Sequence, residues 1–143
     1  MSAERLYTPQ LLAAAMELAS YPPIETAPFS GSARSPACGS TLAMDLMLHA
    51  NGRIERLGMT VRACAVGQAA AAVFARHAAG LTQADIRAAH DSLSAWLDGE
   101  GPAPDWPDLG LIAPARDFRG RHGAMLLPWK AAMAALSSAP AAS

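Results

Sequence analysis

Length, composition and charge define the broad class of the protein. Its 143 residues suit one domain with a hydrophobic core, and 11 basic against 12 acidic side chains argue against a surface built to bind nucleic acid or a membrane. No apolar run approaches the roughly 20 residues that span a bilayer, and the residues after Met1 lack the basic and then apolar pattern of a secretory signal. We therefore expect a single cytoplasmic domain over residues 1–143, in which cysteines stay reduced.

The first part of the chain predicts one helix and then an extended segment. Thr8 supplies a capping hydroxyl and Pro9 suits the first helical position, so a helix begins there, and its apolar stripe ends near Ser20. Residues 21–36 are rich in proline, glycine and serine. This composition predicts a mobile, extended segment with a short edge strand.

A β-hairpin is predicted over residues 41–62, with Asn51 and Gly52 at its tip. Asn-Gly is typical of a two-residue turn in which both positions have positive φ, and it places Ala50 opposite Arg53. A slip of one residue would turn the apolar face of the hairpin to water, so the alternation fixes the register. The apolar pairs of this register are Leu42 with Val61, Met44 with Met59 and Leu46 with Leu57.

Helices dominate the rest of the chain. Residues 65–79 form an alanine-rich helix that Gly80 stops, and Thr82 with Asp85 gives the next helix a capping-box start. Residues 99–107 are a loop, residues 109–118 are irregular, and a last helix covers residues 126–136, with Pro128 tolerated only in its first turn. Residues 137–143 are predicted to be a disordered tail. The order of elements predicts an α+β fold, a small antiparallel sheet with a central hairpin packed against several helices.

Two cysteines flank the predicted hairpin, and its register brings them together. If the ladder continues beyond the strands, Cys38 lies opposite Ala65 and Cys64 lies opposite Gly39. Because neighbouring strands lie about 4.8 Å apart, both sulfurs can reach one small site at the open end of the hairpin. The pattern predicts a thiol or metal site. The alternative is that both cysteines are small, buried hydrophobic residues.

Each cysteine has a local setting that suits a thiolate. Cys64 lies where a strand passes into the start of a helix, and the free amides and dipole of a helix start stabilise negative charge. Arg62 adds positive potential if its side chain turns towards the sulfur. Cys38 lies in a Pro-x-Cys-Gly turn, where Gly39 lets backbone amides approach a sulfur or a metal.

Three motifs together resemble a known family. Residues 35–39 (SPACG), residues 63–69 (ACAVGQA) and residues 121–129 (RHGAMLLPW) are similar to the motifs of the NifU/IscU/SufU iron–sulfur cluster assembly scaffolds, and the last motif is most similar to the SufU branch. The resemblance covers about residues 5–136. It implies an IscU/SufU-like α+β fold and a role as a scaffold protein rather than an enzyme.

The resemblance implies a metal or cluster site with an incomplete ligand set. The family uses three cysteines and an aspartate; Cys38 and Cys64 match the first two cysteines, whereas Ser40, a poor ligand, stands at the aspartate and Ala124 at the third cysteine. A cluster iron or a structural zinc requires about four ligands, mainly thiolates. His122 is the candidate third metal ligand; the alternative is a solvated loop histidine.

The resemblance also implies the function and the partners. The leading hypothesis is a scaffold or sulfur-transfer accessory that binds a transient [2Fe–2S] cluster or zinc and works with a cysteine desulfurase and iron–sulfur acceptor proteins. A second copy of the chain in a homodimer, or a partner, would complete the coordination. A second hypothesis is a degenerate, metal-free paralogue that is a binding module for a desulfurase or another assembly factor. A third is a redox-regulated protein in which Cys38 and Cys64 form a reversible disulfide.

Overall fold

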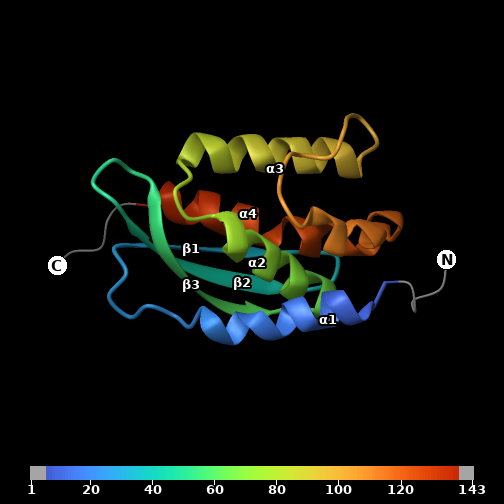
Figure 1. Ribbon diagram of the computed structural model, residues 1–143, viewed down its shortest axis with the longest axis horizontal. Coiled ribbons are helices and arrows are strands. Elements are labelled where there is room, and N and C mark those ends of the chain that lie inside the picture. The colour runs from blue at the N-terminus through green and yellow to red at the C-terminus, as the bar shows by residue number, and fades with distance from the viewer. Residues whose placement is uncertain (1–5, 139–143) are drawn as a thin grey trace.

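A three-stranded antiparallel sheet with helices on one face organises the protein, as the computed structural model of residues 6–138 shows (Figure 1). The strand order is β1-β2-β3, so the hairpin of β2 and β3 is extended by β1 along the free edge of β2. The strands are β1 (Phe29–Arg34), β2 (Thr41–Leu48) and β3 (Ile54–Arg62). The α-helices are α1 (Pro9–Met16), α2 (Ala65–His77), α3 (Gln83–Leu97) and α4 (His122–Leu136). The predicted α+β class is confirmed.

The predicted hairpin register is confirmed along the strands, away from the tip. Leu42 pairs with Val61, Met44 with Met59 and Leu46 with Leu57. Five of these six side chains are completely or largely buried, because they face the helices, and Val61 is half-buried. The predicted edge strand is also present as β1, where Gly31 pairs with Met44.

The hairpin tip differs from the predicted two-residue turn. The N–H of His49 donates to the carbonyl of Arg53 at 2.8 Å, and the N–H of Gly52 donates to the carbonyl of His49 at 2.9 Å, so residues 50–52 form the loop. Gly52 has a φ of +83°, whereas Asn51 does not have a positive φ. A turn followed by a left-handed glycine is the common three-residue hairpin loop. The pairing of Ala50 with Arg53 is therefore wrong, and an irregularity near the tip absorbs the one-residue difference.

The first three helices begin where the sequence predicts. The hydroxyl of Thr8 accepts a hydrogen bond from the N–H of Leu11 at 3.1 Å, and Thr82 and Asp85 form a reciprocal capping box. α1 passes into a 3₁₀ turn (Glu17–Ser20), and α2 ends two residues earlier than predicted, before the left-handed Gly80 with φ +87°. Two short 3₁₀ turns (Leu109–Leu111 and Ala113–Asp117) occupy the stretch predicted to be irregular, and a third (Arg119–Arg121) follows it.

The last helix is longer than predicted. α4 begins at His122 rather than at residue 126, so Pro128 lies in its second turn and not in its first. Proline has no N–H, and the carbonyl of Ala124 therefore lacks its helical donor. The helix continues through this position because its apolar face packs on α2, β1 and β2, with Trp129 only 1% exposed. Tertiary packing outweighs the missing hydrogen bond, as it often does in protein helices.

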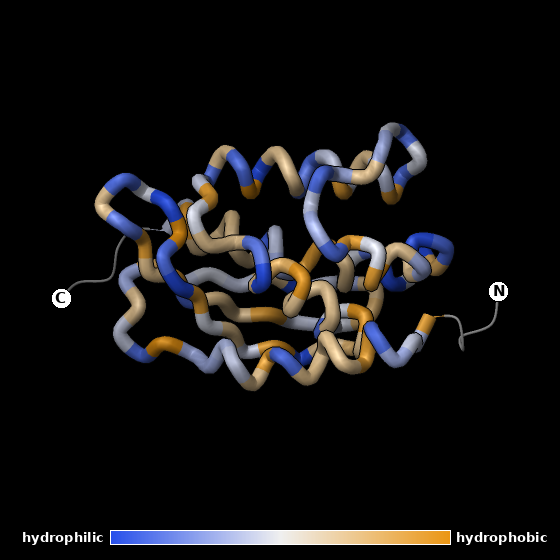
Figure 2. Tube along the Cα trace, in the orientation of Figure 1, coloured by the Kyte–Doolittle hydropathy of each residue, from blue (hydrophilic) through white to orange (hydrophobic). Residues whose placement is uncertain are grey.

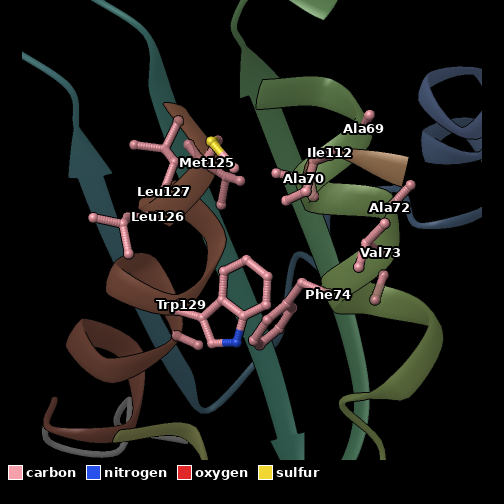
Figure 3. Close-up of a cluster of buried hydrophobic side chains, with 14 of the residues drawn as sticks. Ala69, Ala70, Ala72, Val73, Phe74, Ile112, Met125, Leu126, Leu127 and Trp129 are labelled. Carbon is pink, nitrogen blue, oxygen red and sulfur yellow. The ribbon is translucent and has the colours of Figure 1, made fainter. Parts of the chain in front are cut away.

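An aromatic cluster marks the centre of the core between α2 and α4 (Figure 3). Phe74 stacks on Trp106 with ring centroids 5.5 Å apart and meets Trp129 edge to face at 5.4 Å. The indole N–H of Trp106 donates to the carbonyl of Val73 at 3.0 Å, which satisfies a buried donor. Figure 2 shows that hydrophilic residues gather instead at the hairpin tip and in the loop after α3.

Small residues let α4 approach the sheet closely. A Cβ added at Gly31 of β1 would collide with the backbone of Ala134 and Ala135 in α4. Strand and helix are therefore in backbone contact at this point, and the register of α4 along the sheet is fixed. No helix within residues 6–138 is long and apolar enough to cross a membrane. Of the predicted disordered tail, residues 139–143 lie outside the described residues.

Candidate thiol and metal site

Three segments that are distant in sequence meet at one end of the molecule. They are the connection between β1 and β2, the start of α2 and the start of α4 (Figure 1). A Cβ added at Gly123 in α4 would collide with the hydroxyl of Ser35, and a Cβ added at Gly67 in α2 would lie 3.4 Å from the Cβ of Ala124. The start of α4 therefore packs between the segments that carry Cys38 and Cys64. All three motifs of the sequence belong to this end.

The loop that carries Cys38 is closed by its own backbone. The N–H of Ser35 donates to the carbonyl of Ser40 at 2.8 Å, and the N–H of Gly39 donates to the carbonyl of Ser35 at 2.7 Å. Gly39 has a φ of +72°, a conformation that other residues rarely adopt, which explains the glycine after the cysteine. The result is a tight loop with Cys38 exposed to solvent.

Two buried serines surround the sulfur of Cys38. Its Sγ lies 3.4 Å from Oγ of Ser35 and 3.1 Å from Oγ of Ser40, and these serines are 1% and 5% exposed. Hydrogen bonds with Ser35, which has the larger effect, and with Ser40 lower the pKa of the Cys38 thiol below its ordinary value, because the hydroxyls can donate to the thiolate. The charge of Arg121 acts in the same direction. Cys38 is thus an exposed cysteine whose surroundings favour the nucleophilic form.

Arg121 reaches this site from the start of α4. It precedes the first residue of the helix, and its Nη2 donates to the hydroxyl of Tyr7 at 3.3 Å. This contact links the segment before α1 to the end of the molecule that carries Cys38. The positive charge of Arg121 is therefore held at the end of the molecule that carries Cys38, where it favours the thiolate.

Cys64 occupies the junction that the sequence predicts. It is the N-cap of α2, with φ −65° and ψ 171°, and its carbonyl accepts the first helical hydrogen bond from the N–H of Gln68 at 3.0 Å. The amide of Gln68 also donates to the carbonyl of Ala63 at 2.9 Å, which holds the strand exit against the helix. Cys64 is half-buried, whereas Cys38 is exposed.

His122 is the first residue of α4 and not part of the preceding loop. Its Nε2 lies 2.6 Å from the carbonyl of Arg116. A carbonyl can only accept, so Nε2 carries the proton and Nδ1 is the nitrogen left for another partner. A histidine that ligates a metal is commonly oriented by such a bond from its other nitrogen.

The donor set does not by itself make a complete metal site. Within residues 6–138 there is no group of three or more histidine, cysteine, aspartate or glutamate side chains that could hold a metal ion. The structure therefore does not assemble Cys38, Cys64 and His122 into a three-ligand site. A [2Fe–2S] cluster or a structural zinc needs about four ligands, and Cys38 is instead surrounded by serines.

Sequence reasoning missed the groups that act on Cys38. It assigned no role to Ser35 or Arg121, and it treated Ser40 only as a poor metal ligand. The available signal was local: serines three residues before and two residues after a cysteine in a tight turn place two hydroxyls within reach of its sulfur. The contribution of Arg121 depends on the packing of α4, which no local pattern reveals.

Comparisons with known proteins show which solved structures share this architecture. No model of a protein family matches the chain, and a search of curated proteins finds no match. Among solved structures, the chain is similar to the N-terminal part of a nitrogen-fixing NifU-like protein from Brucella abortus, with 30% identity, a TM-score of 0.83 and 93% coverage of both chains.

Two further solved structures share the fold. A putative iron–sulfur cluster assembly scaffold protein for the SUF system, from the thermophile Fervidobacterium islandicum AW-1, is 17% identical with a TM-score of 0.79, covering 95% of this chain and 100% of that one. A hypothetical protein is 16% identical with a TM-score of 0.66, covering 90% and 97%. At these identities the likeness concerns the fold alone.

Proposed function

The chain belongs to the NifU/IscU/SufU family of iron–sulfur cluster assembly scaffolds, and from this premise we propose that it serves cluster assembly through an incomplete site on Cys38 and Cys64. The two thiolates would bind a transient [2Fe–2S] cluster or zinc as cargo. The role is that of a scaffold or sulfur-transfer accessory and not of an enzyme. A cytoplasmic location, which the sequence predicts, keeps both thiols reduced.

One observation carries the proposal: the packing of the three motif segments at one end of the molecule. Ser35 contacts Gly123, and Ala124 contacts Gly67, so the loop of Cys38 and the helix start of Cys64 adjoin the same turn of α4. The exposure of Cys38 supports access for another protein. Its lowered pKa supports ligation and sulfur transfer, because the thiolate is the reactive form.

The missing ligands would come from a second molecule. Ser40 and Ala124 stand where the family has an aspartate and a cysteine, and hydroxyl and methyl groups do not replace them for iron or zinc. A second copy of the chain, a cysteine desulfurase or an acceptor protein could supply the remaining donors. We therefore propose that cargo binds in an assembly rather than on the isolated chain.

A second candidate function has an observation in its favour. The structure contains no three-ligand metal group within the described residues 6–138, which suits a paralogue that binds a desulfurase or another assembly factor without carrying metal. In this case the fold is retained for docking, and Cys38 and Cys64 are dispensable. The two candidates differ in whether the thiols matter.

Metal and sulfur analysis of the full chain distinguishes them. The protein is purified anaerobically and incubated with a cysteine desulfurase, cysteine, dithiothreitol to reduce the persulfide sulfur, and either ferrous iron or zinc. It is then analysed for bound iron, zinc and sulfide and by visible absorption. We expect complexes of the natural chain to carry cargo. This cargo should be lost in Cys38→Ser and in Cys64→Ser and retained in the control Ser92→Ala on α3. Desulfurase binding without cargo, equal in all variants, would establish the metal-free module. Full cargo in the variant without either cysteine would refute both candidates.

A further inference from the structure

The outer face of the sheet carries a hollow that the proposed function does not use. It lies on the side turned away from α2 and α4, has a volume of about 420 Å³, and adjoins the strand ends that lead to the loop of Cys38. Two rows of paired residues cross the three strands there. The rows are Arg34–Thr41–Arg62 and Ser32–Ala43–Thr60.

Both rows point to the same face because side chains alternate along a strand. Arg34, Ala43 and Arg62 are exposed, whereas the intervening Leu42 is completely buried on the inner face. Small residues from all three strands line the hollow together with two arginines, one on each outer strand. We call this feature the arginine hollow.

No side chain in the described part of the chain neutralises the charge of the arginine hollow. Within residues 6–138, Arg34 and Arg62 form no ion pair and no side-chain hydrogen bond. The nearest carboxylate along β2 on this face is that of Asp45, which already accepts hydrogen bonds from the hydroxyl of Ser30 at 2.8 Å and the N–H of Ile24 at 3.0 Å. Arg34 and Arg62 therefore line the hollow with no protein partner for their guanidinium groups among the described residues.

The geometry suits one anionic group held between two positive side chains. Arg34 and Arg62 are separated by one strand, so their backbones lie roughly 9–10 Å apart at the usual strand spacing of about 4.8 Å. Arginine side chains are long enough to converge across this gap. The planar guanidinium matches the oxygens of phosphate and carboxylate in pairs, and the hydroxyls of Ser32, Thr41 and Thr60 add donors.

We propose that the arginine hollow is an oxyanion-binding site that holds a phosphate or carboxylate group between Arg34 and Arg62. The group could belong to a small phosphorylated or acidic compound or to an acidic segment of a protein partner. The site needs neither cysteine. It therefore stands independently of the proposed cluster-assembly function.

Titration of the isotope-labelled full chain, followed by nuclear magnetic resonance, tests the site. The probes are inorganic phosphate and a capped hexaglutamate peptide, each compared with sodium chloride at equal ionic strength. We expect saturable shifts of the amide signals of Ser32, Thr41 and Thr60 with at least one probe. Tighter binding of phosphate indicates a phosphorylated compound, and tighter binding of the peptide indicates an acidic partner.

Charge-neutral variants assign the binding to the two arginines. Arg34→Gln and Arg62→Gln should each weaken binding by roughly threefold to fivefold, the effect of losing one exposed charge contact. Arg56→Gln, which removes an exposed arginine elsewhere on β3, should leave binding unchanged. Shifts that match those with chloride and do not saturate, or equal weakening by Arg56→Gln, would overturn the proposal. The Cys38→Ser variant should bind normally, which separates this test from that of the thiol site.

Discussion

Single side chains lower the pKa of the Cys38 thiol, and most of them act through hydrogen bonds. Ser35 and Ser40 are buried, yet both hydroxyls contact the exposed sulfur, so two polar groups of the protein surround this thiol. Ser40, which the resemblance matches to the family aspartate, is thus a hydrogen-bond partner that favours the thiolate.

Ser40→Ala should slow the alkylation of Cys38. Loss of one hydroxyl donor raises the pKa of the thiol, so less thiolate is present at neutral pH. In the background of Cys64→Ser, which leaves one reactive sulfur, we expect the rate with iodoacetamide to fall by roughly threefold, the effect of one modest hydrogen bond. The rate is measured from pH 6 to pH 9. Ser30→Ala, on the sheet, should not change it; an unchanged rate in Ser40→Ala would remove the serine from the site.

Gly123→Ala should destabilise the protein because a methyl group there collides with Ser35. The cost of such overpacking is about 1–3 kcal/mol of unfolding free energy. Urea denaturation measures the unfolding free energy of Gly123→Ala, of Ser35→Gly and of the variant with both changes. The control is Gly120→Ala, where an added Cβ meets open space. The double variant should lose less than the two single changes predict. Strict additivity would show that α4 and the loop of Cys38 do not touch there.

Charged side chains join separate elements at the scale of helices. Arg76 of α2 makes two hydrogen bonds to the carboxylate of Glu17 after α1, one of them 2.8 Å long from Nε, and lies 3.3 Å from the carboxylate of Asp108. Asp108 also lies 2.7 Å from Nε2 of His77 and has a φ of +66°. These contacts join the end of α1 and the loop after α3 to the middle of the structure.

Acidification should weaken this junction. The hydrogen bond with Arg76 lowers the pKa of Glu17, and the hydrogen bond with His77 lowers that of Asp108, so both carboxylates stabilise the fold above their ordinary pKa values. This stability is present above the ordinary pKa values of the two carboxyl groups and is lost as pH falls below them, through their lowered folded pKa values. The Tm measured from pH 7 to pH 3 should fall less steeply in Arg76→Met than in the natural chain, and less steeply than in the control Arg87→Met on α3. Parallel curves would show that the junction contributes nothing.

Elements whose signals are local could be predicted from the sequence. The capping hydroxyl of Thr8, the alternation over β2 and β3, and the capping box at Thr82 each depend on neighbouring residues, and all are present. The start of α4 could not be predicted, because Pro128 disfavours a helix locally and only packing against the sheet offsets this. The hairpin tip was also predicted wrongly, because the local Asn-Gly signal indicated a two-residue turn and the structure has a three-residue loop.

At the scale of the whole molecule, the fold brings the three motif segments together at one end. The sequence predicted that the two cysteine segments lie close together, but not how the start of α4 packs against them. Register arguments indicated that Cys38 and Cys64 adjoin, and the contacts of Gly67, Ala124 and Gly123 show how α4 packs at that end. The ligand set stays a prediction, because the remaining donors are proposed to come from another molecule. The sheet face with Arg34 and Arg62 escaped prediction for a different reason: a pair across three strands is visible only after β1 is placed.

Native mass spectrometry of the anaerobically reconstituted protein tests the central claim, that the chain offers two thiolates and another molecule completes the site. The full chain is incubated with ferrous iron and sulfide, or with zinc, and the mass of each species gives the cargo per chain. We predict that the monomer carries no stable cargo and that [2Fe–2S] or zinc appears only on a dimer or on a complex with a desulfurase or acceptor. A monomer that retains one cluster or one zinc ion with high affinity would contradict the account.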